Sequence, residues 1–125
     1  MLQDKYRSVL EFGEKLDVKN GYVREEGGKL KIGGQVPYAL DRDLMWDVIK
    51  QIEGWETEVE ADISFEHTDI YGYYTVQSGD TLWKISERVL GKGNRYKEIF
   101  ELNTDRLDDP DKIQVGQKLK LPNRQ

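Results

Sequence analysis

Apolar side chains return every three or four residues in two stretches of the first half of the chain, which predicts two amphipathic helices. The first helix spans residues 6–16 and the second spans residues 41–54. Asp41 would cap the second helix, because its carboxylate can accept bonds from the free amides of the first turn. Gly54 suits the left-handed residue that ends many helices. The apolar stripes consist of Tyr6, Val9, Leu10 and Leu16 in the first helix and Met45, Val48, Ile49 and Ile52 in the second.

Two further stretches of the first half predict strands. Residues 21–24 and 29–32 flank Glu25-Glu26-Gly27-Gly28, a hairpin turn in which glycine adopts positive φ at little cost. From residue 56 to residue 66 apolar and polar positions alternate, which predicts a half-buried strand. Its polar face would be solvated or attract a cation, and Lys29 and Lys31 could pair with it across the sheet. That face includes Glu56, Glu58, Glu60 and Asp62.

The second half begins and ends on a predicted strand, with two helices between. Residues 74–77 and 118–121 are the strands, and they can pair antiparallel beneath the helices. The first helix opens at Asp80 or Thr81, and the second opens at Asn94. The order of the first half is helix, strand, strand, helix, strand. Together the two halves predict an α+β chain of two small domains.

The distribution of charge separates the same two halves. Net charge is −5, yet residues 1–70 hold 9 basic and 16 acidic side chains, while residues 71–125 hold 10 and 8. This shift supports domains at residues 1–70 and 71–125. It also argues against a nucleic-acid partner, because binding phosphates requires a strong basic patch. The chain has no cysteine, which excludes disulfides and thiolate metal sites.

The most specific pattern lies in the second half. Residues 74–85 run Tyr-Thr-Val-Gln-Ser-Gly-Asp-Thr-Leu-Trp-Lys-Ile, and residues 109–122 run Asp-Pro-Asp-Lys-Ile-Gln-Val-Gly-Gln-Lys-Leu-Lys-Leu-Pro, with Asn103 between them. A strand, Gly-Asp-Thr-Leu, two helices, Asn and Gly-Gln-x-Leu-x-Leu-Pro in this order resemble a LysM module, a small bacterial carbohydrate-binding domain of βααβ order. The resemblance implies a non-enzymatic protein that binds N-acetylglucosamine-containing glycan of peptidoglycan or chitin type.

In that family glycan lies between the first strand–helix loop and the loop before the last strand, which implies a two-sided site here. Gly79 would let the backbone approach a sugar, and Leu82 or Ile113 would contact an acetyl methyl group. The alternative is a retained scaffold, because any strand-to-helix turn favours Gly followed by Asp. A single module predicts weak binding, since multivalency usually supplies the strength. The candidates are Ser78, Gly79, Asp80, Thr81, Leu82 and Trp83 on one side and Asp109, Pro110, Lys112, Ile113 and Gln114 on the other.

The first half resembles a BON domain over about residues 5–66, which implies an α/β sandwich of αββαβ order. Residues 28–37 run Gly-Lys-Leu-Lys-Ile-Gly-Gly-Gln-Val-Pro, and residues 52–59 run Ile-Glu-Gly-Trp-Glu-Thr-Glu-Val, with Trp55 at the usual valine. BON followed by LysM resembles small bacterial potassium-binding proteins. That resemblance implies an alternative function, a cytoplasmic ion-responsive protein that holds K⁺ through backbone carbonyls. The candidate ion site is the turn Gly54, Trp55 and Glu56.

Other functions are less favoured. Glycoside hydrolysis needs two carboxylates flanking a cleft, and no segment is large enough to build one. His67 is the only histidine and has no metal-ligand type nearby, so a surface or packing role is expected. Trp83 adjoins the loop motif and is the best sugar-stacking candidate, whereas Trp46 and Trp55 are expected to pack against the domain core or at an interface. An interaction module with neither ligand is the third alternative.

The location of the protein is predicted from its apolar runs. None approaches the length of a membrane span, and the first residues lead into no stretch of signal-peptide type. We therefore expect a cytoplasmic monomer for the chain as given. A chain trimmed from a longer precursor would instead belong to the cell envelope.

Overall fold

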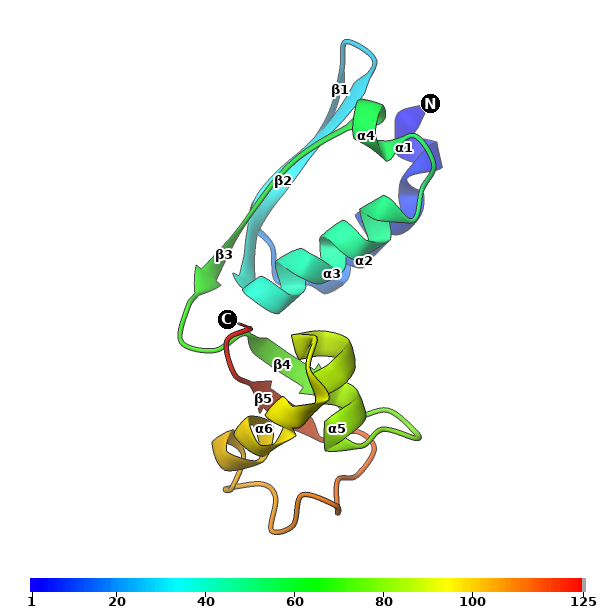
Figure 1. The fold of residues 1–125 in the computed structure, drawn as a ribbon. Coiled ribbons are helices and arrows are strands. Elements are labelled where there is room, and N and C mark those ends of the chain that lie inside the picture. Colours follow the sequence, from blue (N-terminus) through cyan, green and yellow to red (C-terminus); the bar gives the residue numbers. More distant parts are fainter. Residues whose placement is uncertain (125) are drawn as a thin grey trace. The chain divides into compact units, whose positions relative to one another are not determined.

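In the computed structural model, which describes residues 1–124, the chain divides into two units, Met1–Thr68 and the residues from Asp69 onward (Figure 1). Each unit contains both helices and strands, which confirms the α+β prediction. Among the described residues no helix combines the length and the apolar character needed to cross a membrane.

The first unit packs helices against a three-stranded sheet. Its elements are α1 (Leu2–Lys5), α2 (Arg7–Lys15), β1 (Lys19–Glu26), β2 (Lys29–Tyr38), α3 (Ala39–Lys50), α4 (Trp55–Glu58) and β3 (Val59–His67). β2 lies between β1, to which it is antiparallel, and β3, to which it is parallel, since α3 carries the chain back along the sheet. α3 contacts α2, β2 and β3. The core between them includes Tyr6, Val9, Leu30 and Ile49, all fully buried.

The predicted hairpin is present and is longer than expected. Gly27 and Gly28 form a two-residue turn with φ of 60° and 77°, and Glu26 pairs with Lys29 across it. The predicted pairing of lysines with the acidic face is confirmed, because Lys29 and Lys31 lie 3.3 and 3.9 Å from the carboxylate oxygens of Glu60. That face is therefore partly neutralised by neighbouring lysines.

Residues 56–58 were expected to begin a strand, and this prediction is wrong because they lie in α4. The amides of Thr57 and Glu58 each donate to the Gly54 carbonyl at 3.2 Å, which closes a helical turn. Glu58 is held by the Tyr6 hydroxyl at 2.9 Å and by Lys5 Nζ at 2.5 Å. Burial, together with the bond to Glu58, raises the pKa of Tyr6 to about 12. A tertiary contact has thus overridden the alternating pattern.

The ends of α3 also differ from the prediction. The helix begins at Ala39, two residues before Asp41, and the Asp41 carboxylate reaches back to accept the Tyr38 amide at 3.0 Å. Asp41 thus satisfies a free amide from inside the first turn rather than from the cap. Gly54 is left-handed, with φ of 92°, as predicted for a residue that ends a helix. However, α3 already ends at Lys50, and Gly54 instead directly precedes α4.

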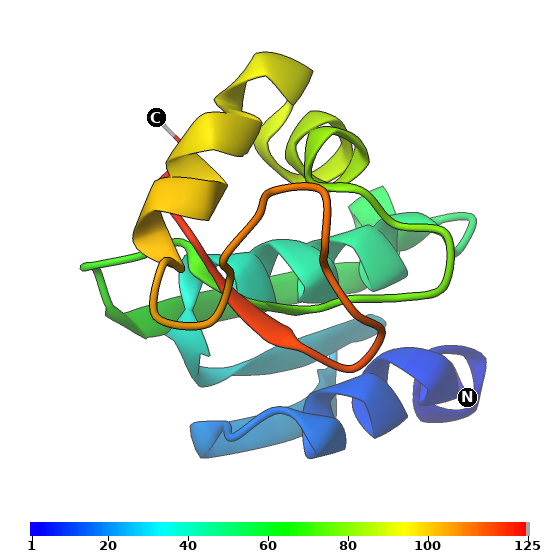
Figure 2. The same cartoon turned by 90° about the horizontal axis from the view of Figure 1, so that it is seen from below.

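In the second unit two short strands pair antiparallel, and the helical segments lie between these strands in the sequence. The elements are β4 (Gly72–Thr75), α5 (Leu82–Ile85), a π-helical turn (Ser86–Leu90), a 3₁₀ turn (Gly93–Arg95), α6 (Tyr96–Leu102) and β5 (Lys118–Leu121). β5 has the predicted bounds, and its Leu119 and Leu121 are fully buried. α6 begins at Tyr96, because the expected start at Asn94 lies in the 3₁₀ turn. Figure 2 shows the connection from α6 to β5, in orange, as a long irregular loop.

Candidate functional site

A groove of about 300 Å³ lies in the second unit, between the loop that leads into α5 and the loop that leads into β5. Its volume is at the lower end of the range for small-molecule sites, so it would hold one or a few sugar rings. The lining combines aromatic, aliphatic and acidic side chains and contains no lysine or arginine. The lining residues are Asp80, Thr81, Leu82, Trp83, Tyr96, Pro110, Asp111 and Ile113.

The loop before α5 is fixed by Asp80. Its Oδ2 accepts the Tyr74 hydroxyl at 2.6 Å and the Gln77 amide at 2.7 Å, and its Oδ1 lies 3.5 Å from Arg88 Nη2. These bonds close a turn over Ser78 and Gly79, where Gly79 is left-handed with φ of 85°. The Asp80 carboxylate, only 7% exposed, is therefore occupied by the protein and not free for a ligand.

The same contacts set the ionisation of Asp80. Burial alone would raise its pKa, but the bonds from Tyr74 and Gln77 and the charge of Arg88 outweigh burial and hold the pKa below its ordinary value. Because the folded-state pKa is the lower one, the carboxylate stabilises the fold above about pH 3.9. That contribution is lost as the pH falls through the folded-state pKa.

We expect Asp80→Asn to weaken the dependence of stability on pH. Between about pH 4 and pH 2 the free energy of unfolding of the variant should fall less steeply than that of the unmodified protein, because the variant has no carboxylate to protonate there. Urea unfolding across a pH series measures this slope. Asp108→Asn, at an exposed aspartate in the long loop before β5, is the control and should leave the slope unchanged. Equal slopes for all three proteins would contradict the assignment.

Trp83 presents an aromatic surface at the groove. Thr81 caps α5 by accepting the Lys84 amide at 3.1 Å, which sets the direction in which the first turn of the helix presents its side chains. Trp83 is 49% exposed, and its indole lies 5.8 Å, centroid to centroid, from the ring of Tyr96. It also lies directly on Gly93, where an added Cβ would be 2.3 Å from Trp83 Cε2. The ring is thus supported from behind and open to ligand.

The predicted glycan residues separate into two groups. Asp80, Thr81, Leu82, Trp83, Pro110 and Ile113 line the groove, whereas Ser78, Gly79, Asp109, Lys112 and Gln114 are not among its lining residues. Asp109 instead shapes its loop, because its Oδ1 accepts the Asp111 amide at 2.8 Å. The Gln114 amide donates to Gln117 Oε1, also at 2.8 Å.

Two lining residues, Tyr96 and Asp111, are absent from the sequence-predicted set. Tyr96 lies in the helix that was predicted to open at Asn94, and the only signal in the sequence for a role in the groove was its aromatic ring. Asp111 lies between the predicted Pro110 and Lys112, so the loop was identified but the residue was not.

In the turn proposed to hold an ion, residues 54–56, the first carbonyl already accepts hydrogen bonds from the protein itself. The Gly54 oxygen accepts the amides of Thr57 and Glu58 at 3.2 Å and the Thr57 hydroxyl at the same distance. Trp55 packs edge-on against Trp46, with ring centroids 6.0 Å apart, and both are partly buried against the core of the first unit. His67 lies 3.0 Å from Glu66 and against Tyr38. Within residues 1–124, no three His, Asp or Glu side chains gather as metal ligands would.

Comparison with known proteins identifies the second unit. Residues 74–122 match the LysM domain family, so this segment is a LysM domain and the resemblance in its sequence is confirmed. The BON-like resemblance of the first unit stays a prediction.

The chain is also similar to three curated proteins. It is 54% identical over 50 residues to Potassium binding protein Kbp of Escherichia coli, a match that covers 40% of this chain and 34% of that protein. It is 47% identical over 49 residues to an uncharacterized protein of Deinococcus radiodurans, covering 39% of this chain and 19% of the relative. It is 45% identical over 49 residues to SpoIVD-associated factor A of Bacillus subtilis, covering 39% and 12%. The matched segment therefore spans about a third or less of each relative.

Proposed function

We propose that the LysM domain of this chain binds a glycan that contains N-acetylglucosamine, of peptidoglycan or chitin type, without changing it chemically. The observation that carries the proposal is the position of Trp83. Its half-exposed ring stands at one side of a groove whose other side includes Pro110 and Ile113. An aromatic face opposite apolar loop residues suits a pyranose ring and an acetyl methyl group, both of which present C–H surfaces.

The charges of the groove also favour a neutral sugar. Its lining includes no basic side chain that could recognise a phosphate or a carboxylate. Of its two acidic residues, Asp80 is already bound by Tyr74, Gln77 and Arg88. Polar recognition in the groove therefore falls to the Asp111 side chain and the Tyr96 hydroxyl.

Binding rather than catalysis is proposed for the whole chain. The LysM domain is a binding domain, and hydrolysis of a glycoside needs a proton-donating and a second free carboxyl group on the two sides of the bond. In this groove only Asp111 could serve, because Asp80 is occupied by its three partners. One shallow site implies a dissociation constant on the order of 0.1–1 mM for a short oligomer.

An NMR titration of the ¹⁵N-labelled chain with N-acetylglucosamine oligomers tests the proposal. Saturable amide shifts confined to residues 78–83, 96 and 110–113 are the expected result. Glucose oligomers of the same length are the control and should shift the same amides less, because they carry no acetyl group. The absence of saturable shifts at millimolar ligand would overturn the proposal.

Potassium binding is the second candidate function, favoured by the 54% identity with Potassium binding protein Kbp over the LysM region. We rank it second because the Gly54 carbonyl in the candidate turn already accepts three donors. The same NMR sample, titrated with potassium chloride against sodium chloride, provides the comparison. Saturable shifts specific to potassium at residues 54–56 would reverse this ranking.

A further inference from the structure

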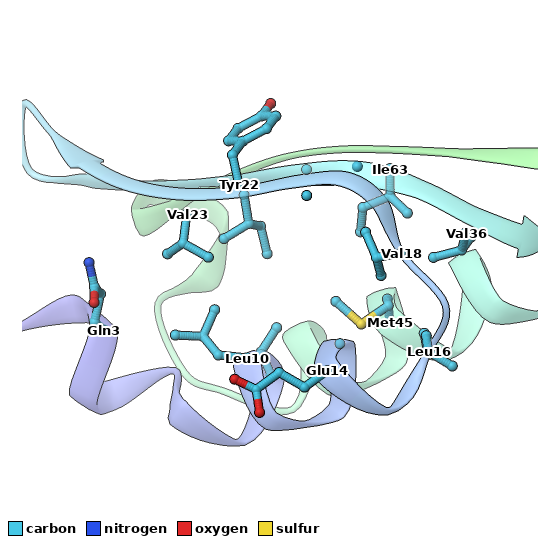
Figure 3. A pocket seen from close by; sticks show the side chains of 16 residues that line it. Gln3, Leu10, Glu14, Leu16, Val18, Tyr22, Val23, Val36, Met45 and Ile63 are labelled. Carbon is cyan, nitrogen blue, oxygen red and sulfur yellow. The ribbon is translucent and has the colours of Figure 1, made fainter.

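A second hollow, of about 470 Å³, lies in the first unit between α2 and the β1–β2 hairpin (Figure 3). Its volume falls within the range of small-molecule sites. The wall is mostly aliphatic, and in Figure 3 the labelled side chains of Leu10, Val23 and Met45 lie around the same space. Leu16, Val18 and Ile63 also belong to the apolar lining. All of these residues belong to the first unit, so the hollow is separate from the glycan groove.

The packing between α2 and the hairpin leaves this space open. On the α2 side Gly13 contributes no side chain, and a Cβ added there would meet only the flexible end of Met45, at 3.6 Å. On the sheet side all eight residues of β1 are exposed, including Val23 at 42%. The part of this apolar wall that stays exposed, which includes Val23, is a surface to which water binds poorly and an apolar ligand binds well.

The charge at this pocket is unbalanced. Glu14 is the one charged residue among those that line it, and no lysine or arginine is present in the lining. Residues 1–124 provide no ion pair or hydrogen bond for the Glu14 carboxylate, which is exposed to solvent. Residues 1–70 as a whole carry 9 basic and 16 acidic side chains, so the surrounding field is negative as well. A cationic group at this edge of the pocket would therefore meet a favourable charge.

We propose that this pocket binds a small hydrophobic ligand that carries one ammonium group. The apolar part of the ligand would replace water between Leu10, Val23 and Met45, and its ammonium group would pair with Glu14 at the α2 edge of the pocket. A fatty carboxylate of the same size would bind less well, since it would bring a second negative charge to Glu14. This proposal does not depend on the glycan function.

A titration with three ligands of one chain length tests the site. n-Octylammonium, octan-1-ol and octanoate are added to the full chain at concentrations too low for the ligands to form micelles or aggregates. The NMR shifts of methyl and amide groups are then recorded. The expected result is saturable binding with shifts at Leu10, Val23 and Met45, strongest for the ammonium and weakest for the carboxylate. No saturable shift with any ligand would overturn the site. Equal affinity for ammonium and carboxylate would overturn the role of charge.

Two variants separate charge from shape. Glu14→Gln should lower the affinity for n-octylammonium about threefold, as expected for a partly exposed ion pair, and leave that for octan-1-ol unchanged. Glu11→Gln, one turn earlier on α2 and outside the lining, is the matched control and should have a smaller effect. Gly13→Leu should fill the pocket and weaken all three ligands about fivefold, with circular dichroism as the check on folding. Should Gly13→Leu fail to fold, the affinities of Glu14→Gln and Glu11→Gln for n-octylammonium still test the proposed ion pair.

Discussion

Replacing Asn103 by alanine is expected to destabilise the protein by about 3 kcal/mol. This side chain is fully buried and joins α6 to β5. Its Nδ2 donates to the Ile99 carbonyl at 2.7 Å and to the Lys120 carbonyl at 2.8 Å, and its Oδ1 accepts the Lys120 amide at 2.8 Å. Each bond contributes about 1 kcal/mol net, and alanine would leave the Lys120 backbone groups without these partners. The loss is a large share of the roughly 5–15 kcal/mol that stabilise a small domain.

Urea unfolding followed by circular dichroism measures this effect. Asn94→Ala, at an exposed asparagine in the neighbouring 3₁₀ turn, is the matched control and should change the stability by less than about 0.5 kcal/mol. Asn103→Asp keeps the acceptor for the Lys120 amide but loses both donors and buries a carboxylate. It should therefore destabilise at least as much as alanine at neutral pH. Equal stability of Asn103→Ala and Asn94→Ala would disprove the structural role of Asn103.

The elements that the sequence predicted well are those whose pattern is local. β5 was predicted with its bounds, because Lys and Leu alternate from residue 118 to residue 121 as they do in a half-buried strand. The hairpin turn was found because Gly27-Gly28 permits positive φ on both residues. Thr81 was one of two proposed starts of its helix, and it does cap α5. In each case neighbouring residues alone determine the conformation.

The predictions that failed depend on contacts between residues far apart in the sequence. Residues 56–58 alternate as a strand does, but Glu58 is held by Tyr6 and Lys5, which lie more than fifty positions earlier. The apolar pocket of the first unit was not predicted either. Its presence depends on the distance between α2 and β1, which periodicity does not specify.

The candidate site shows the same division. The two loops were identified from their sequence, yet which of their residues face the groove depends on the network of Asp80 and on the long connection before β5. The exposure of Trp83 depends on Gly93, ten positions later, and on Tyr96 beyond it. A sequence pattern gives the residue types of a loop but not their orientation.

Trp83→Ala is expected to weaken binding of N-acetylglucosamine oligomers at least about tenfold, which corresponds to about 1.4 kcal/mol. The half-exposed indole is the largest aromatic surface in the groove, and alanine leaves nothing there to stack on a sugar ring. Calorimetric or NMR titration gives the affinities. Trp83→Phe should retain part of the binding, since it keeps an aromatic ring. Because the ring is half exposed, both variants should remain folded, as circular dichroism can verify.

Gly93→Ala tests whether the orientation of the ring matters as well as its presence. The added Cβ would lie 2.3 Å from Trp83 Cε2, far inside contact distance, so the indole must move off its support beside Tyr96. The variant keeps every side chain of the groove, yet we expect its affinity to fall by several fold. An affinity equal to that of the unmodified protein in both Gly93→Ala and Trp83→Ala would mean that glycan binds elsewhere. A loss of affinity in Trp83→Ala but not in Gly93→Ala would show that the ring contributes to binding and that its orientation does not need to be fixed.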